Sequence, residues 1–215
     1  MSKPILLLFG AGSRVGKGLT DGFVNAGYRV ATVNRSAPEQ PTTSASGQVL
    51  SIRADISQPA QIPPVFEQVR NTWGGAPSVV VWNAASFSVV PDQSNIFTLG
   101  LDAINHDMAL MITSPFVAAR EAVEGWKTDN LPGRFIMTGN CLPRSILPLP
   151  NLTTSGIGKA GGAYWVGQAD ALYKSKGWRY VQFLSEYDNC RCADTLPDSS
   201  SPMSVTPMVN PRGTR

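Results

Sequence analysis

The feature that most constrains this chain is a regular alternation of short apolar segments with longer segments of helical character. The short segments are rich in β-branched and other apolar residues and are predicted strands, at residues 4–9, 29–33, 49–52, 78–82, 134–138 and 179–184. The segments between them are predicted helices, at residues 15–26, 58–73, 97–126 and 155–174. This alternation predicts an α/β fold with a parallel, doubly wound sheet and helices on both faces.

Length and composition indicate how many domains to expect. The chain has 215 residues, of which 42% are hydrophobic and 15% charged, as is typical of a globular protein. We expect one folded domain over residues 1–188. The remaining residues, 189–215, are rich in Pro and Ser and show little apolar periodicity, so they are expected to form a flexible tail.

Charge and hydropathy disfavour several classes of partner. The net charge of +3 comes from scattered basic residues, which predicts no nucleic-acid partner. No apolar run approaches the roughly 20 residues of a membrane helix, so we expect no membrane partner and a cytoplasmic location. The chain has one histidine, His106, and the pair Cys190 and Cys192 has no further ligands nearby. We therefore expect no structural metal site.

A glycine-rich segment, residues 10–18, lies between the first predicted strand and the first predicted helix. Glycines let a backbone turn sharply and approach a diphosphate closely, and the following helix start offers N–H groups and the positive end of its dipole. Strand, loop and helix in this order predict dinucleotide binding rather than a ligand-free turn. The residues expected to contact the cofactor here are Gly12, Ser13, Arg14, Val15, Gly16 and Gly18.

The glycine spacing differs from the G-x-G-x-x-G of many dehydrogenases. It resembles the Thr-Gly-x-x-x-Gly-x-Gly loop of the short-chain dehydrogenase/reductase family, with Ala11 in the place of Thr. The resemblance extends over residues 3–181. It implies a Rossmann-like fold, a nicotinamide cofactor and a small-molecule substrate. Since such proteins usually continue beyond the sixth strand, it also implies that the fold is truncated at its C-terminal end.

Other positions match the family in the same order along the chain. Asp55 follows the third strand, where the family has an Asp that contacts the adenine. Asn83, Ala84 and Ala85 resemble the Asn-Ala-Gly part of the family's Asn-Asn-Ala-Gly segment, which lines the adenosine. Asn105 lies on the long helix, where the family keeps an Asn of its proton relay. The resemblance implies that Lys159 is the active-site lysine that holds the nicotinamide ribose.

The end of the second strand bears on the choice of cofactor. An NAD-specific site usually has a carboxylate there, bound to the ribose 2′-hydroxyl. This chain has Asn34 at that position, followed by Arg35 and Ser36. An arginine can hold a 2′-phosphate by charge-assisted hydrogen bonds, and Arg14 is a second candidate. The alternative is that both arginines are solvated surface charges. We predict NADP(H).

The reaction centre departs from the family pattern. The family's Tyr, one helical turn before the Lys, is replaced by Ser155, whose hydroxyl is much less acidic. The family's Ser after the fifth strand is also missing, and Thr138 or Asn140 could supply a hydrogen bond there. Three accounts stay open. Lys159 donates the proton while Ser155 and Asn140 orient the substrate, a substrate hydroxyl or a water chain through Asn105 delivers it, or the protein binds NADP(H) without turnover.

The sequence thus predicts an NADP(H)-dependent oxidoreductase acting on a small carbonyl or alcohol. The alternatives are a non-catalytic NADP(H)-binding or interaction protein, and an isomerase or dehydratase on the same scaffold. Small residues on the last predicted helix, among them Gly161 and Gly162, allow another helix to approach closely. In the family this helix often forms a dimer interface, so a homo-oligomer is expected, with packing inside the chain as the alternative.

Overall fold

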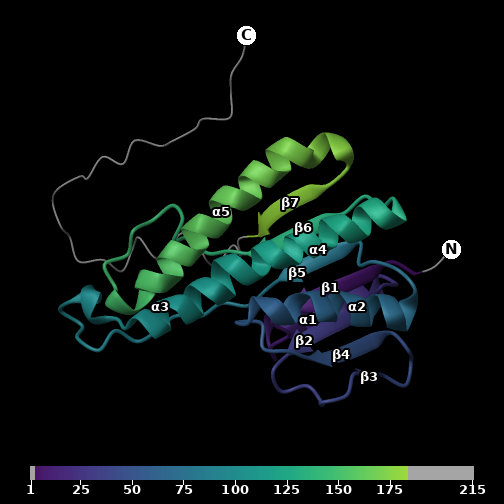
Figure 1. Ribbon diagram of the computed structural model, residues 1–215, viewed down its shortest axis with the longest axis horizontal. Helices are drawn as coiled ribbons and strands as arrows, with labels where there is room; N and C mark the ends of the chain where they lie inside the picture. Colours follow the sequence, from purple (N-terminus) through teal and green to yellow (C-terminus); the bar gives the residue numbers. More distant parts are fainter. Residues whose placement is uncertain (1–2, 184–215) are drawn as a thin grey trace, which may run out of the picture.

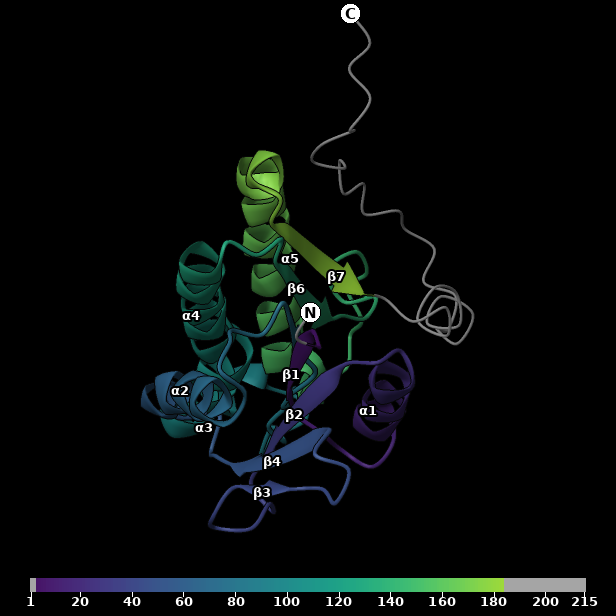
Figure 2. The ribbon, with the colours of Figure 1, turned by 90° about the vertical axis from the view of Figure 1, so that its right-hand side faces the viewer.

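The computed structural model describes residues 3–183, which form one sheet with helices on both of its faces (Figures 1 and 2). The strands are β1 (Ile5–Phe9), β2 (Arg29–Asn34), β3 (Thr42–Thr43), β4 (Val49–Arg53), β5 (Val79–Trp82), β6 (Arg134–Thr138) and β7 (Arg179–Phe183). Their order in the sheet is β3-β4-β2-β1-β5-β6-β7, and every neighbouring pair is parallel except β3 with β4. The predicted parallel, doubly wound sheet is confirmed.

The helices cover the two faces unequally. They are α1 (Val15–Asn25), α2 (Ile62–Trp73), α3 (Leu101–Met108), α4 (Ser114–Asp129) and α5 (Thr153–Tyr173), with short 3-10 turns at Pro59–Gln61, Ile96–Thr98, Pro150–Leu152 and Lys174–Lys176. In Figure 2, α1 lies on one face, and α2, α4 and α5 lie on the other. Each face has its own buried apolar cluster, so the strands are covered from both sides, as their continuous apolar sequences indicate.

The structure differs from the predicted elements in two places. The segment at residues 37–47, which lies between the second and third predicted strands, contains the two-residue strand β3, which pairs Thr42 with Ser51. The single helix predicted at 97–126 is α3 and α4 joined by a π-helical turn, Ala109–Thr113. Pro115 explains the wider turn, because proline has no N–H to bond the carbonyl of residue 111.

The buried side of this long helical segment differs from the one that its apolar residues indicate. The sequence spacing places Leu101 and Phe116 on the apolar face, but they are 70% and 58% exposed. The buried positions include Asp107, Met111 and Trp126 instead. The difference is present before the π turn, at Leu101 and Asp107, and continues after it, at Phe116.

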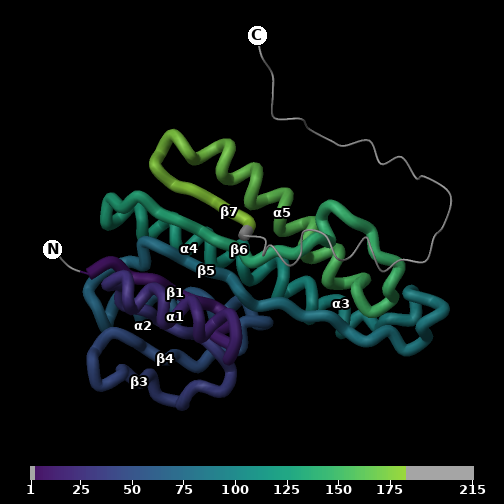
Figure 3. The backbone as a smooth tube through the Cα atoms, turned by 180° about the vertical axis from the view of Figure 1, so that it is seen from behind, coloured from purple at the N-terminus to yellow at the C-terminus, as the bar shows by residue number. Residues whose placement is uncertain are grey.

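Helix α3 and the start of α5 meet at the carboxyl ends of the parallel strands (Figure 3). In the described part of the chain, no helix is both long enough and apolar enough to cross a membrane. The expectations for Cys190, Cys192 and the tail at 189–215 concern residues that lie outside the described range.

Candidate functional site

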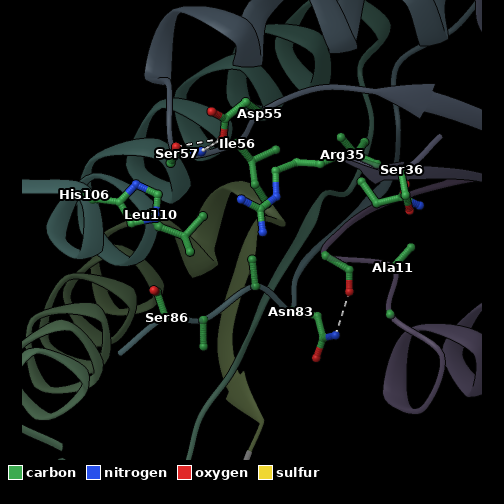
Figure 4. Close-up of a pocket in the computed structure, with 16 residues that line it drawn as sticks. Ala11, Arg35, Ser36, Asp55, Ile56, Ser57, Asn83, Ser86, His106 and Leu110 are labelled. Atoms are coloured by element: carbon green, nitrogen blue, oxygen red, sulfur yellow. Dashed lines mark hydrogen bonds between the residues drawn. The ribbon is translucent and has the colours of Figure 1, made fainter. Parts of the chain in front are cut away.

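A pocket of about 720 Å³ opens at the carboxyl ends of β1, β2, β4 and β5 (Figure 4). The chain runs from β1 toward β2 on one side and returns to β5 on the other, so the pocket lies at the switch point where α/β sheets bind ligands. Sixteen residues line it: Gly10, Ala11, Gly12, Val33, Asn34, Arg35, Ser36, Asp55, Ile56, Ser57, Asn83, Ala84, Ala85, Ser86, His106 and Leu110.

The glycine loop is shaped by close backbone approaches. Gly10 has a φ of +82°, and a Cβ atom there would lie 2.7 Å from the backbone nitrogen of Ala84. A Cβ atom on Gly16 would lie 2.6 Å from the backbone of Ala11. Only glycine fits either position, because backbone atoms cannot move aside as a side chain can. The loop is therefore held tightly against the strand ends, which leaves room above it for a ligand.

The rest of the predicted loop set lies beside the pocket rather than in its wall. Gly12 lines the pocket, whereas Ser13, Arg14, Val15, Gly16 and Gly18 do not. Gly16 is buried under the loop, and the other four are exposed at the start of α1. The first-turn N–H groups of a helix have no partner within the helix, so this end of α1 can bind an anion.

Asn83 ties the glycine loop to the end of β5. Its side-chain Nδ2 donates to the carbonyl of Gly10 over 2.8 Å, and its backbone N–H donates to the carbonyl of Phe9 over 2.8 Å. Gly10 in turn donates to the carbonyl of Val33 at 3.1 Å. The ends of β1, β2 and β5 are thus fixed relative to one another, and Asn83, Ala84 and Ala85 all line the pocket.

Arg35 and Asp55 define a charged end of the pocket. Figure 4 shows the exposed Arg35 side chain reaching over the pocket from the end of β2. The Asp55 carboxylate accepts hydrogen bonds from the hydroxyl of Ser57 at 2.7 Å and from its N–H at 3.1 Å. The Ser57 hydroxyl holds the pKa of Asp55 below its usual range, and Arg35 acts in the same direction. A neighbouring hollow is lined by both Arg35 and Arg53.

Lys159 is buried, with 5% of its surface exposed, and its Nζ donates to the carbonyl of Thr138 over 2.7 Å. Ser155, one turn earlier on α5, is also buried. A Cβ atom on Gly158 would lie 2.7 Å from Cβ of Met111, so glycine lets α5 approach the π turn closely. Ser155 and Lys159 thus lie where α5, the π turn and the end of β6 meet, outside the wall of the pocket.

Asn140 and Asn105 differ in burial and in their position relative to the pocket. Asn140 is half-buried just after β6, and its Oδ1 accepts a hydrogen bond from the N–H of Leu142 at 3.1 Å. Asn105 is exposed, roughly 200° around α3 from the buried Asp107. The structure does not bring Asn105 into the pocket, and Asp107 is the polar residue that α3 directs toward α5.

Sequence reasoning missed several polar groups of this region. Ser57, Ser86 and His106 line the pocket, and Asp107 binds Thr154 on α5. No sequence signal pointed to Asp107, because the side of α3 that is buried is known only from the structure. Two glycines of α5 that could have allowed contact with a second subunit pack instead against other elements of the same chain. Cβ atoms on Gly161 and Gly162 would meet Ile112 and Met137, which supports packing within the chain at these two positions.

The sheet order, the glycine loop and the pocket at the switch point define a Rossmann-type nucleotide-binding protein. Residues 10–162 match the family described as Enoyl-(Acyl carrier protein) reductase. The short chain dehydrogenase/reductase dmxR12 of Cryptosporiopsis sp. (strain 8999) is 33% identical over 195 residues, which cover 84% of this chain and 75% of that protein.

Two solved structures share the fold at lower identity. A short chain dehydrogenase from Burkholderia cenocepacia J2315 in complex with NADP has a TM-score of 0.68 at 19% identity, over 84% of this chain and 73% of that one. A short chain dehydrogenase from Leptospira borgpetersenii with bound NAD+ has a TM-score of 0.67 at 18% identity, over 84% and 69%. This chain belongs to the short-chain dehydrogenase/reductase family, whose members are oxidoreductases with nicotinamide cofactors.

Proposed function

We propose that this protein is an NADP(H)-dependent oxidoreductase that acts on a small carbonyl or alcohol. The observation that carries the proposal is Arg35, whose side chain reaches over the nucleotide pocket from the end of β2. The preceding residue, Asn34, supplies no carboxylate to repel a phosphate. A guanidinium group can bind a 2′-phosphate by paired, charge-assisted hydrogen bonds.

The residues present fit a dinucleotide along the whole pocket. The positions of Gly10 and Gly16 exclude side chains where a diphosphate would approach the backbone. Gly12, Ser13, Arg14, Val15, Gly16 and Gly18 would bind the diphosphate through the loop and the start of α1. Asp55, Asn83, Ala84 and Ala85 would frame the adenosine, and Asn34, Arg35 and Ser36 would surround its 2′-phosphate.

The relatives narrow the cofactor only to a nicotinamide dinucleotide. One neighbour holds NADP and another NAD+, so the fold accommodates both. The choice therefore rests on this chain's own side chains, and the basic groups here are Arg35 and, beside it, Arg53. Nη1 of Arg53 lies 3.5 Å from Oε1 of Glu39, so the positive charge of Arg53 is partly neutralised. We therefore assign the binding of the 2′-phosphate to Arg35.

The reaction end of the proposed site is built from Lys159, Ser155, Asn140 and Asn105. The bound nicotinamide supplies or accepts the hydride. Lys159, already buried beside the end of β6, would hold the nicotinamide ribose and supply the positive charge near the reacting oxygen. Ser155 and Asn140 would orient the substrate by hydrogen bonds. Asn105 would belong to a water chain to solvent, as its exposed position allows.

Two other functions compete with this proposal. The Ser in place of the family's Tyr favours a non-catalytic NADP(H)-binding protein, because a serine hydroxyl is a poor general acid. The same scaffold with a retained cofactor could also serve an isomerase or dehydratase. Fold alone does not decide among them.

The proposal is tested with NADPH and a panel of small carbonyl compounds, measuring NADPH oxidation and products. We expect at least one substrate to be reduced, and Lys159→Met to lower that rate about 100-fold, a typical effect of losing a proton-transfer or orienting group. Lys174→Met, at an exposed position just after α5, should leave the rate unchanged.

The outcomes of this panel separate the three functions. NADPH binding without oxidation by any substrate would favour the non-catalytic protein. Conversion of a substrate without net loss of NADPH would favour the isomerase or dehydratase. An unchanged rate in Lys159→Met would remove Lys159 from the reaction.

A further inference from the structure

A second hollow, of about 440 Å³, adjoins the nucleotide pocket at its charged end. Arg35 and Asp55 line both spaces, so the two are continuous along these side chains. The proposed function uses Arg35 for the 2′-phosphate and leaves two other charged residues of the hollow, Arg53 and Glu39, without a role. The hollow therefore extends the pocket at the end where the 2′-phosphate is proposed to bind.

The backbone holds Arg53 beside the end of β2. In the parallel register of β2 and β4, the Cα atom of Arg53 is the partner of the Cα atom of Asn34, the residue before Arg35. The N–H of Ala54 donates to the carbonyl of Asn34 at 3.3 Å, which continues the pairing one residue further. The side chains of Arg35 and Arg53 thus line one hollow from two adjacent strand ends.

The charged residues that line the hollow balance one another, since two are arginines and two are carboxylates, Glu39 and Asp55. The Asp55 carboxylate is held in place by the N–H and the hydroxyl of Ser57. Glu39 is held more loosely. Its Oε1 lies 3.5 Å from Nη1 of Arg53, and 87% of its side chain is exposed. An exposed ion pair contributes little to stability, so Glu39 can leave Arg53 for solvent with little loss.

We propose that Arg53 is a second specificity-determining residue, which exchanges Glu39 for the 2′-phosphate of NADP(H) and binds it together with Arg35. A phosphate monoester carries a charge of about −1.5 to −2 at neutral pH, more than one guanidinium group neutralises. Two guanidinium groups match this charge, and each presents a fork of N–H donors to the phosphate oxygens. Glu39 thus competes with the cofactor for Arg53. This inference rests on the proposed function, because it requires NADP(H) in the pocket.

The alternative is that Arg53 and Glu39 form a surface ion pair with no part in binding. Loss of either partner would then affect NADPH and NADH alike, or affect neither. The proposed exchange instead predicts opposite effects from the two members of one ion pair. Removal of the Arg53 charge weakens NADPH binding, whereas removal of the Glu39 charge strengthens it.

The test is a titration of the full chain and its variants with NADPH and with NADH. We expect NADPH to bind about tenfold more weakly to Arg53→Met, as for the loss of hydrogen bonds to a charged group. NADPH should bind about threefold more tightly to Glu39→Gln. NADH lacks the 2′-phosphate, so its affinity should stay unchanged in both variants. In the double variant the gain from Glu39→Gln should disappear, because Glu39 acts through Arg53.

The matched controls are Arg120→Met and Glu121→Gln. These residues form an ion pair on α4 with 2.9 Å between Nη2 and Oε1, and they line neither the pocket nor the hollow. Both affinities should stay unchanged in these variants. Because they remove the same charges elsewhere on the chain, they show whether overall charge alone alters the binding of NADPH.

Several results would overturn the inference. Unchanged NADPH affinity in Arg53→Met would do so, as would equal weakening of NADPH and NADH, or a gain from Glu39→Gln that persists without Arg53. If Arg53→Met does not fold, Glu39→Gln decides alone, and the absence of a gain overturns the inference. If Arg35→Asp weakens NADPH binding and Arg53→Met does not, the inference fails while the proposed function stands. If the unaltered protein binds neither dinucleotide, the proposed function fails first.

Discussion

Replacing Gly16 by alanine is expected to destabilise the glycine loop and abolish measurable NADPH binding. The added Cβ atom would lie 2.6 Å from the carbonyl carbon and Cα of Ala11, and real Cβ atoms do not approach backbone so closely. Gly16 is buried, so the loop itself must move. Overpacking of this kind costs about 2 kcal/mol of unfolding free energy. The displaced loop would no longer follow the diphosphate.

The matched control for this change is Gly22→Ala on the same helix. A Cβ atom on Gly22 would meet nothing within 4 Å, and the residue is exposed. Alanine there should stabilise the helix by about 0.5–1 kcal/mol and leave NADPH affinity unchanged. Denaturant unfolding and NADPH fluorescence titration measure both quantities for both variants. Normal NADPH affinity in Gly16→Ala would show that the loop does not form the diphosphate site.

Replacing Arg35 by aspartate should reverse the cofactor preference. NADPH is expected to bind about 100-fold more weakly, because the change removes charge-assisted hydrogen bonds and sets a carboxylate against the 2′-phosphate. The affinity for NADH should fall little, since a carboxylate at this place can accept a hydrogen bond from the ribose 2′-hydroxyl. Titration of both dinucleotides against each variant gives the ratio of affinities.

Two further arginine variants make the Arg35 result interpretable. Arg120→Asp alters an exposed arginine on α4, beside Glu121, and controls for the change in overall charge. Arg14→Asp alters the second predicted phosphate ligand, which is exposed at the start of α1 and does not line the pocket. If Arg14→Asp shifts the preference and Arg35→Asp does not, the phosphate site has been assigned to the wrong residue.

The parts of this molecule that follow from local sequence were predictable. The turn from β1 into α1 needs glycine at fixed positions, and the strand residues are continuously apolar because both faces of the sheet are covered. The alternation of strands and helices then indicated a parallel, doubly wound sheet, since consecutive parallel strands connect through right-handed crossovers. The pocket residues at strand ends, such as Asn34 and Asn83, follow from that topology.

The parts that depend on long-range contacts were not predictable. The hydrogen bond between Asp107 and Thr154 joins residues that are 47 positions apart. No local sequence pattern around either residue predicts this contact. The strand β3 contains two residues, too few for a periodic signal. Constant helical spacing misplaced Phe116, which is 58% exposed, because the side of the long helix that is buried depends on the elements that pack against it. Asn105 is assigned to the reaction only by its place in the family pattern.

Calorimetric titration of the full chain with NADPH and with NADH tests most directly whether the glycine loop and Arg35 form a cofactor site. We predict one binding site per chain and at least tenfold tighter binding of NADPH than of NADH. Equal affinity for the two would contradict the role given to Arg35. Absence of heat with both dinucleotides, at concentrations up to the millimolar range typical of weak cofactor sites, would contradict the whole account.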